Sequence, residues 1–544
     1  MTDNEIVADP TKPGDALRVS RARLADGDLD GAEQVLRWAL DFNPSSSPLL
    51  SGLGDIAARR GQHDVAIELT EKGIEANPAD LNIRNQLATL HLQQANFAEA
   101  ETTVRKALEL SPKDAGLMRR MSEIAARRGD FDTAFSWADQ AVAANPTDPH
   151  SYSNQATLHL QRGNLDEAET AARRAVELAP NNTVFMRRMS EIAGWRGDSR
   201  GAFQWADRAL EANPADPNSY HHQSTLHLQQ GNLAEAEAAA RKALELSPKN
   251  VGFMRRMSDI AARRSDFDGA FEWAERAVAA NPSDPHSHNQ QATLHLWKGN
   301  FTEAETAAHK ALDLAPKNAG FMRRLSDIAA RRGDFDKAFE WADRAVATNP
   351  GDPHAYNQLS TLHLWQGNFN EAETAARRAL ELAPKSAGFM RRMSDLAARR
   401  ADFDGAFDWA DRAVETNPGD AHSYNHHATL HLQQGNFADA ETAVRKALEL
   451  APRDANILRR MSDIAARRGD FDSAIAWAEK AVAANPGDPQ SHGHLAASHV
   501  QKGDLPRALE AFRKAIDLSP DDSSLKSRAS YLASALRRSG NDAR

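Results

Sequence analysis

Hydrophobic and polar positions repeat with a helical spacing along almost the whole chain, and the stretch 353–386 illustrates the pattern. One predicted helix carries larger residues on a single face: Tyr356, Leu359, Leu362 and His363. A second carries a face of alanines that permits close contact between helices: Ala372, Ala376 and Ala379. Residues spaced three and four apart lie on one side of an α-helix. The pattern predicts two amphipathic helices that pack against each other.

Short signals mark where these two helices begin and end. Asp352 and Pro353 are typical of an N-cap and of the first position of a helix. Gly367 breaks the first helix, and Asn368 is suited to cap the second. Pro384 ends the second helix, because proline cannot continue one. We therefore predict an all-helical fold built from helical pairs.

Proline sets the period of the whole array. It recurs every 34 residues, at Pro44, Pro78, Pro112, Pro146, Pro180, Pro214, Pro248, Pro282, Pro316, Pro350, Pro384, Pro418, Pro452, Pro486 and Pro520. No interval contains an insertion, so no catalytic domain interrupts the array between about residue 13 and residue 522. A helical pair of this length buries too little surface to be stable alone, so each pair has to stack on its neighbours.

A second period of 68 residues shows that two kinds of unit alternate. One kind reads YNQLSTLHLWQGNFNEAETAARRALELAP (356–384), and the other reads FMRRLSDIAARRGDFDKAFEWADRAVATNP (321–350). The stretch SSLKSRASYLASALRRSGNDAR predicts a further amphipathic helix that caps the last unit. The predicted parts are a flexible N-terminal tail, a fifteen-unit solenoid, a capping helix and a polar tail, at residues 1–12, 13–522, 523–538 and 539–544.

These units resemble the tetratricopeptide repeat family. The resemblance rests on the 34-residue period, the glycine between the helices, the alanine face and the terminal proline. It implies a right-handed superhelix, or α-solenoid, whose first helices line a concave groove, and a role in protein–protein interaction. The first helix departs from the family pattern, because Tyr, His or Met stands where Trp is usual.

Composition and charge narrow the possible functions. The chain has no cysteine, which excludes disulfides, zinc–thiolate sites and thiol nucleophiles. Its net charge of −10 argues against general nucleic-acid binding, for which a basic face normally dominates. The first residues lack the basic and apolar regions of a signal peptide, and no apolar run reaches the length of a membrane span. We expect a cytoplasmic protein with no membrane partner.

The first helix of the arginine-rich unit places its charges on one side. In FMRRLSDIAARR, Met322 and Leu325 are predicted to pack inward, while Arg323, Asp327 and Arg331 face the groove. The last three are spaced four residues apart and are expected to form a charged ladder. The second helix of the unit carries an excess of acid, which predicts a cationic groove and an anionic convex wall. A purely structural, salt-bridged surface is the alternative interpretation.

Candidate partner-binding residues recur at fixed places in the units. The arginines are Arg119, Arg187, Arg255, Arg323, Arg391 and Arg459 near the start of the helix, and Arg263, Arg331 and Arg399 at its end. The alternate units contribute groove amides at Asn289, Asn357 and Asn425. This row is similar to the asparagine ladder in the repeat arm of the O-linked N-acetylglucosamine transferases, although only Asn154 falls at the equivalent position. That resemblance implies side-chain amides that hold a peptide backbone.

Three tryptophans are exceptions to the repeat. Trp195 replaces a recurrent groove arginine, and Trp297 and Trp365 replace a recurrent glutamine. With Arg331 between the last two, they form a candidate Trp–Arg–Trp row, and exposed Trp and Arg are common binding hot spots. Drift at a tolerant surface position is the alternative. The tryptophans of the second helices are expected in the core: Trp137, Trp205, Trp273, Trp341, Trp409 and Trp477.

Histidines also recur every 68 residues, at His91, His159, His227, His295, His363, His431 and His499. Their helical phase points inward, and metal sites need several ligands close together, so we expect them to pack in the interior. A weaker candidate for a divalent metal is the cluster His422, His426, His427 and His431. No phosphate-binding glycine loop, nucleophile elbow or HExxH helix is present, so we expect neither an enzyme nor a cofactor.

The leading hypothesis is a non-catalytic scaffold whose groove binds an extended acidic or polar segment of a partner protein. Amides of one unit type would hold backbone groups, and arginines of the other would pair with carboxylates. One alternative is a structural protein whose chains assemble edge to edge. A weaker alternative is a binder of an anionic polymer such as nucleic acid or an acidic glycan, which the overall charge disfavours.

Overall fold

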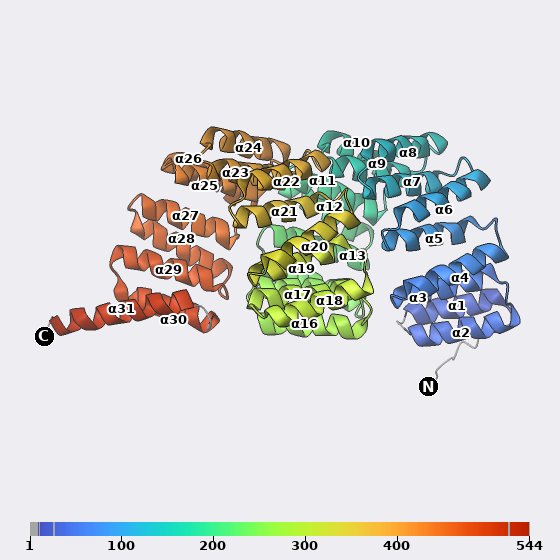
Figure 1. The fold of residues 1–544 in the computed structure, drawn as a ribbon, viewed down its shortest axis with the longest axis horizontal. Helices are drawn as coiled ribbons and strands as arrows, with labels where there is room; N and C mark the ends of the chain where they lie inside the picture. The colour runs from blue at the N-terminus through green and yellow to red at the C-terminus, as the bar shows by residue number, and fades with distance from the viewer. Residues whose placement is uncertain (1–8, 10, 26–27, 520–522, 543–544) are drawn as a thin grey trace.

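The computed structural model describes residues 9, 11–25, 28–519 and 523–542, and 31 α-helices with no strand make up this part of the chain (Figure 1). The first helices of the fifteen pairs are α1 (Pro13–Ala25), α3 (Ser47–Arg59), α5 (Leu81–Gln93), α7 (Ala115–Arg127), α9 (Pro149–Gln161), α11 (Thr183–Trp195), α13 (Pro217–Gln229), α15 (Val251–Arg263), α17 (Pro285–Lys298), α19 (Ala319–Arg331), α21 (Pro353–Trp365), α23 (Ala387–Arg399), α25 (Ala421–Gln433), α27 (Ala455–Arg467) and α29 (Pro489–Lys502). The second helices are α2 (Leu29–Phe42), α4 (His63–Ala76), α6 (Phe97–Leu110), α8 (Phe131–Ala144), α10 (Leu165–Leu178), α12 (Ser199–Ala212), α14 (Leu233–Leu246), α16 (Phe267–Ala280), α18 (Phe301–Leu314), α20 (Phe335–Thr348), α22 (Phe369–Leu382), α24 (Phe403–Thr416), α26 (Phe437–Leu450), α28 (Phe471–Ala484) and α30 (Leu505–Leu518). A last helix, α31 (Ser523–Asp542), follows them. The predicted all-helical fold is confirmed.

The helix ends follow the predicted signals with one difference. Asp352 caps α21, where its carboxylate accepts a hydrogen bond of 2.9 Å from the backbone N–H of His354. Gly367 lies between α21 and α22 with a φ of 78°, a conformation that glycine adopts without a steric penalty. Asn368 stands at the N-cap of α22, but its side chain donates to Gln366 at 3.4 Å and does not cap the helix.

The core is a series of small clusters formed where helices of neighbouring units meet. In one of them Ala372 and Ala376 of α22 pack with Met393 of α23, and all three are buried. The tryptophans of the second helices pack against the edges of these clusters and are partly buried. A cation covers the outer face of several of them, as where the Arg344 guanidinium lies 4.2 Å from the ring of Trp341.

The helical pairs wind into a right-handed superhelix (Figure 1). First helices of successive repeats contact one another, as α19 and α21 do, whereas second helices make no comparable contact in the described part of the chain. Helices on the inner side of a curved stack lie closer together than those on the outer side. The first helices therefore line the concave surface, and their exposed side chains face the hollow.

The second superhelical turn rests directly on the first. Four side chains cross between the turns through hydrogen bonds: Asn281 Nδ2 to Arg59 O (3.4 Å), Lys317 Nζ to Asn96 Oδ1 (2.6 Å), Lys385 Nζ to Asn164 Oδ1 (2.5 Å) and Asn485 Nδ2 to Arg263 O (2.7 Å). The partners are 221 or 222 residues apart, and 222 divided by the 34-residue period gives about 6.5 repeats for each turn. We call this line of contacts the seam.

Three glycines make the seam possible. A Cβ atom at Gly351, Gly419 or Gly487 would come within 3.0 Å of backbone atoms of the first turn. The equivalent positions in the first turn carry Ala79, Thr147 and Ala215, where no earlier turn lies alongside. Glycine thus stands at three of the four such positions where the two turns meet, and Ser283, beside Gly61, stands at the fourth.

The last helix closes the apolar end of the array. Leu525, Ala529 and Leu532 of α31 are buried in a cluster with residues of α29 and α30, as in a capping helix. α31 ends at Asp542, so most of the predicted polar tail, 539–544, is helical. A single glycine in a helix costs about 1 kcal/mol, so Gly540 is too weak a signal to end it. The predicted tail 1–12 lies almost entirely outside the described residues.

None of the described helices combines the length and the apolar character needed to cross a bilayer.

Candidate functional site on the concave surface

The packed and exposed faces of the arginine-rich first helix are those that its periodicity predicts. In α19, Met322 and Leu325 are buried, while Arg323, Asp327 and Arg331 retain exposed surface. The prediction of a continuous ladder is wrong at its first step, however. Arg331 pairs with Asp327 at 3.2 Å, but Arg323 turns to the next repeat.

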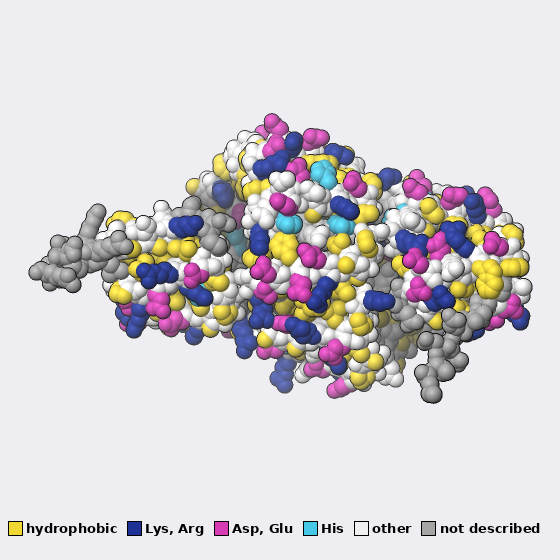
Figure 2. Space-filling model, turned by 90° about the horizontal axis from the view of Figure 1, so that it is seen from below, with side chains coloured by type: hydrophobic (Ala, Val, Ile, Leu, Met, Phe, Trp, Pro, Cys, Tyr) yellow, Lys and Arg dark blue, Asp and Glu magenta, His cyan; other side chains and the backbone are white. Residues whose placement is uncertain are grey.

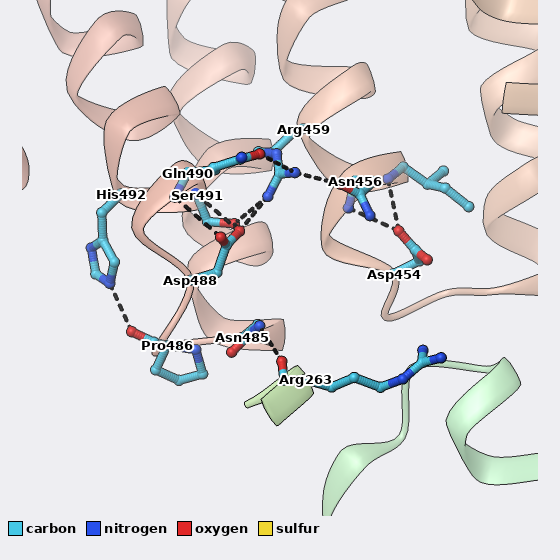
Figure 3. Close-up of polar contacts among 11 residues, drawn as sticks. Arg263, Asp454, Asn456, Arg459, Asn485, Pro486, Asp488, Gln490, Ser491 and His492 are labelled. Carbon is cyan, nitrogen blue, oxygen red and sulfur yellow. Dashed lines mark hydrogen bonds and ion pairs between the residues drawn. The ribbon is translucent and has the colours of Figure 1, made fainter. Parts of the chain in front are cut away.

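The first arginine of each pair forms an ion pair with the aspartate that caps the next first helix. Arg323 lies 3.4 Å from Asp352, and Arg255 lies 3.9 Å from Asp284. The other four pairs are Arg119–Asp148, Arg187–Asp216, Arg391–Asp420 and Arg459–Asp488. Figure 3 shows the last of these, in which the guanidinium also donates to Ser491 at 3.0 Å. Arg323 pairs with the capping Asp352 and not with Asp327, at a junction between helices where both side chains are partly sheltered from water.

Because of these ion pairs, the six arginines are not freely available to a binding partner. Each has a carboxylate partner within the chain, which a ligand would have to displace. Their role in partner binding stays a prediction, while their geometry gives each of them a structural role between repeats.

In four of the six units the second arginine of the pair reaches back to the preceding first helix. Arg324 Nε donates to Asn289 Oδ1 at 3.4 Å, and Arg392 contacts Asn357 in the same way at 3.4 Å. Burial lowers the pKa of Arg324 and of Arg392. The carbonyl oxygens of these groove asparagines are therefore engaged by arginine. Asn425 Oδ1 is buried and has no hydrogen-bond partner in the described part of the chain.

The neighbouring polar position also links repeats. Gln358 Nε2 donates to the buried Ser326 Oγ at 3.2 Å, and Asn154 Nδ2 donates to Ser122 Oγ at 2.9 Å. His222 occupies this position in another repeat, with Nε2 2.8 Å from Ser190 Oγ, and burial lowers its pKa to about 4. The amide row predicted to hold a peptide thus serves largely to connect first helices.

The arginine at the end of each first helix is the most exposed of the three. Arg331 pairs with Asp327, and Arg127 pairs with Glu123 at 2.9 Å. Arg263 and Arg399 are exposed, and neither forms an ion pair within 4.0 Å with any described carboxylate. Of the predicted arginines, these two present their charge to the hollow without competition.

The three exceptional tryptophans are exposed. Trp195 is 42% exposed, and Trp297 and Trp365 are each 48% exposed, at the ends of α11, α17 and α21. Arg331 ends α19, between the last two helices. The predicted Trp–Arg–Trp row therefore lies on three successive first helices, and its role in binding stays a prediction.

Sequence reasoning missed a pocket of about 920 Å³ at the seam. Its walls in the first turn come from α11, α13 and α15, and they include Trp195, His221 and Arg263. The second turn contributes residues at the starts of α25 and α27, including His422 and Asn456. The two walls are more than 150 residues apart in sequence, so only the superhelical pitch brings them together.

The outer surface has mixed charge. Figure 2 shows one face on which Lys and Arg side chains lie among Asp and Glu side chains. Ion pairs within second helices account for part of this mixture, as where Arg173 pairs with Glu169 in α10. The expectation of an anionic convex wall is therefore not met on this face.

The recurrent histidines pack as predicted. His363 stacks on Phe339 with ring centroids 4.7 Å apart, and four other repeats contain the same pair. In the cluster around α25, His426 lies 2.8 Å from Ser394 and His427 lies 2.7 Å from Asp411. In the described residues no three acidic or histidine side chains converge as metal ligands.

Comparison with known proteins agrees with this architecture. Models of the tetratricopeptide repeat match residues 20–80, 85–149, 149–182, 223–285, 289–353, 357–421, 426–489 and 489–522. No curated protein gives a significant match to the chain.

Several solved structures are similar. Yeast Tom70 matches with a TM-score of 0.44 and 17% identity, covering 78% of this chain and 96% of its own. The APC/C hetero-tetramer Cut9–Hcn1 matches with a TM-score of 0.42 and 13% identity, covering 96% and 97%. A tetratricopeptide repeat protein from Parabacteroides merdae matches with a TM-score of 0.35 and 18% identity, covering 43% and 93%. These TM-scores carry no argument about function. The repeat models, which match most of the sequence, show that the chain belongs to the tetratricopeptide repeat family.

Proposed function

We propose that the chain is a non-catalytic scaffold that binds an extended, acidic segment of a partner protein along its concave surface. One observation carries the proposal: exposed tryptophans and arginines end the first helices that line the hollow. Trp297 and Trp365 are half exposed there, and Arg263 and Arg399 have no ion-pair partner among the described carboxylates. Exposed Trp and Arg dominate the binding energy of many protein interfaces.

The spacing of the repeats sets the expected spacing of the ligand. Neighbouring first helices lie about 8–10 Å apart, so like rows recur about every 16–20 Å. An extended peptide rises about 3.3 Å per residue, so that distance covers about five or six residues. The ligand is therefore expected to carry acidic residues at this interval, and its affinity is expected to fall as salt rises.

Selection from a displayed library of random twelve-residue peptides tests this function. The intact chain is expected to enrich peptides rich in Asp and Glu, and the charge-neutralised variant Arg263→Gln/Arg399→Gln is expected to lose that enrichment. Trp365→Ala is expected to weaken the binding of the selected peptides. Trp38→Ala serves as its matched control, because Trp38 is 44% exposed but lies on the second helix α2. Enrichment that ignores acidic residues, or that survives both groove variants, contradicts the proposal.

Self-assembly is the second candidate, and the open edge of the second turn favours it. A Cβ atom at Gly333, Gly367 or Gly469 would meet no described atom within 4 Å, whereas the equivalent glycines of the first turn contact the seam. A second copy resting its first turn on this edge would extend the superhelix. Light scattering that grows with protein concentration in the absence of any partner would support this candidate over the scaffold.

A further inference from the structure

We propose that the pocket at the seam is the main subsite for an acidic side chain of the partner segment, and that it is complete only when the second turn rests on the first. The inference rests on the proposed function and adds the place and the chemistry of one subsite.

The pocket lies where two sets of helix ends meet. Trp195, Gln229 and Arg263 end the first helices α11, α13 and α15, and all three line it. Across from them lie His422 of α25 and Asn456 of α27. In Figure 3, Asn485 of the second turn reaches the carbonyl of Arg263, while the guanidinium of Arg263 extends away from that contact. The seam thus anchors the backbone of a residue whose charge lines the pocket.

Two cations in the pocket have no direct counter-ion. Arg188 is paired with Glu191, and Arg187 is paired with Asp216. Neither Arg256 nor Arg263 has a carboxylate oxygen within 4.0 Å among the described residues. The equivalent guanidinium groups of α23, Arg392 and Arg399, also have no carboxylate oxygen within 4.0 Å among the described residues, but they do not line this pocket.

Some hydrogen-bonding groups in the pocket are also unused. Arg256 donates from Nη2 to Thr225 Oγ1 at 3.1 Å, but its buried Nε has no partner in the described part of the chain. The buried Nδ1 of His221 has none there either. Buried polar atoms are normally paired, and the few that are not often face a ligand or an ion.

The carboxylates around these cations already have other partners, and two of those that line the pocket, Glu191 and Asp420, are paired with Arg188 and Arg391. Asp454 lines the pocket but caps α27, accepting from the backbone N–H groups of Asn456 at 2.8 Å and Ile457 at 3.1 Å. Asp259 accepts from Gln290 at 2.7 Å. These carboxylates are all engaged, so a ligand carboxylate is the remaining group that would pair directly with the guanidinium groups.

Two adjacent departures from the repeat lie at this place. The unit that contains α11 has Gly194 and Trp195 where α7 has Ala126 and Arg127, and the pocket includes both exceptions. A Cβ at Gly419 of the second turn would come within 3.0 Å of the Gly194 carbonyl oxygen. The other two tryptophan exceptions, Trp297 and Trp365, lie outside the pocket, whereas Gly194 and Trp195 shape one of its walls and its contact with the next turn.

The chemistry fits a glutamate side chain. The indole of Trp195 offers a surface for the methylene groups, and two guanidinium groups offer paired donors for a carboxylate. Phosphate carries similar charge but lacks the methylene stem, so the two sources of an anion are separable by experiment.

Fluorescence anisotropy with a fluorescein-labelled hexaglutamate peptide tests the subsite. We expect Arg263→Gln and Arg256→Gln to weaken binding about tenfold, as the loss of a charge-assisted hydrogen bond does. Arg467→Gln and Arg460→Gln remove the equivalent arginines of α27 and are expected to change binding less than twofold. Arg263 is exposed, so its variant keeps the test valid even if Arg256→Gln fails to fold.

A second pair of variants tests the dependence on the seam. Gly419→Ala leaves every cation in place but pushes the turns apart. We expect it to weaken binding of the peptide about as much as Arg263→Gln does. Ala215→Val adds bulk at the equivalent loop of the first turn, where nothing rests on it, and is expected to have no effect. Labelled hexaglutamine should not bind, and inorganic phosphate should not displace hexaglutamate at equal concentration.

The outcomes separate the subsite from the wider function. The composite subsite is wrong if the α15 and α27 variants weaken the binding of hexaglutamate equally, or if Gly419→Ala binds it normally. Neither result contradicts binding along the concave surface. Efficient displacement by phosphate assigns the pocket to a small anion and overturns the glutamate assignment. If hexaglutamate does not bind to the unaltered chain, the proposed preference for acidic segments is wrong as well.

Discussion

At the scale of the residue, the arginine pairs explain why an acidic chain repeats a basic stripe. The first arginine reaches forward to the capping aspartate of the next repeat, and in four of the six units the second reaches back to an asparagine or threonine of the previous one. Each of these four pairs therefore connects three successive first helices, whereas Arg188 and Arg460 contact a carboxylate of their own helix. The stripe is mainly a device that fixes how repeats stack, and only the arginine at the helix end is free of this role.

The ion pair between Arg459 and Asp488 provides a direct test, because both side chains are largely buried. We expect Arg459→Met to lower the free energy of unfolding by about 2 kcal/mol, since a buried carboxylate loses its charged donor. Arg467→Met, on the exposed end of the same helix, is expected to change it by no more than about 0.5 kcal/mol. Urea denaturation followed by circular dichroism measures both. Equal effects of the two variants would show that the ion pair does not connect the repeats.

Buried histidines are expected to make the array sensitive to acid. Burial lowers the pKa of His222 to about 4 and lowers the pKa of His426. His222 lies near Arg187, Arg188 and His221, and His426 lies near Asp395, Arg391, His427 and Arg460. A histidine in the unfolded chain has a pKa of about 6.5. Below that pH the unfolded chain therefore binds protons that the native chain does not bind. Stability is thus complete above about pH 6.5 and falls as the pH drops towards 4.

The repeats supply the control for this effect. Gln290 and Gln358 occupy the same position in other units and make the same bond to a buried serine. We expect the Tm of the unaltered chain to fall by several degrees between pH 7.5 and pH 5.5. The Tm of His222→Gln/His426→Gln is expected to equal that of the unaltered chain at pH 7.5 and to fall less between pH 7.5 and pH 5.5. A Tm that does not change over this range would rule out a role for the histidines.

At the scale of the element, periodicity in the sequence predicts nearly all of the local structure. The spacing of Met322 and Leu325 identifies the packed face of α19, and Asp352 and Pro353 locate the start of α21. The partner of Arg323 was missed. Asp327 lies four residues from both Arg323 and Arg331, so helical spacing alone predicts that it pairs with either, and the position of the next repeat is not encoded in the local sequence. The alanine faces and the tryptophans of the second helices were predictable because their burial depends on contacts with adjacent helices.

The terminal helix α31 is expected to hold the last repeat in place. Leu532 is buried against α29 and α30, and Leu532→Ala should remove about 2–5 kcal/mol of packing energy. The effect should be local, because α31 packs against α29 and α30. Hydrogen exchange of the backbone amides in α29 and α30 is expected to accelerate. Tyr531→Ala is the control, since Tyr531 is 75% exposed. Faster exchange spread over the whole chain would contradict a purely local cap.

At the scale of the whole molecule, the seam sets the pitch of the superhelix and could not be predicted from a single repeat. Its contacts join residues 221 or 222 positions apart, and no local pattern specifies that distance. The sequence does hold one signal, because glycine appears at positions 351, 419 and 487 but not at 79, 147 and 215. The pocket shares this origin, so its two walls were not recognised as neighbours.

Alanine at the three seam glycines is expected to lengthen the molecule without unfolding it. Each added Cβ would lie within 3.0 Å of backbone in the first turn, so the turns have to separate. Small-angle X-ray scattering of Gly351→Ala/Gly419→Ala/Gly487→Ala should show a larger maximum dimension, while circular dichroism stays constant. Thr147→Val should scatter like the unaltered chain. An unchanged scattering profile of the triple variant would mean that the seam does not fix the pitch.

The central claim is that a partner segment lies against the concave ends of the first helices, and photo-crosslinking tests it most directly. The photoreactive residue benzoylphenylalanine is placed at position 365 on α21 or at position 38 on α2, and each variant is irradiated with a selected acidic peptide. Both positions hold a tryptophan of similar exposure, 48% and 44%, so they differ mainly in the face that they occupy. The account predicts a crosslink from position 365 and none from position 38. A crosslink from position 38 alone, or an equal yield from both, would contradict it.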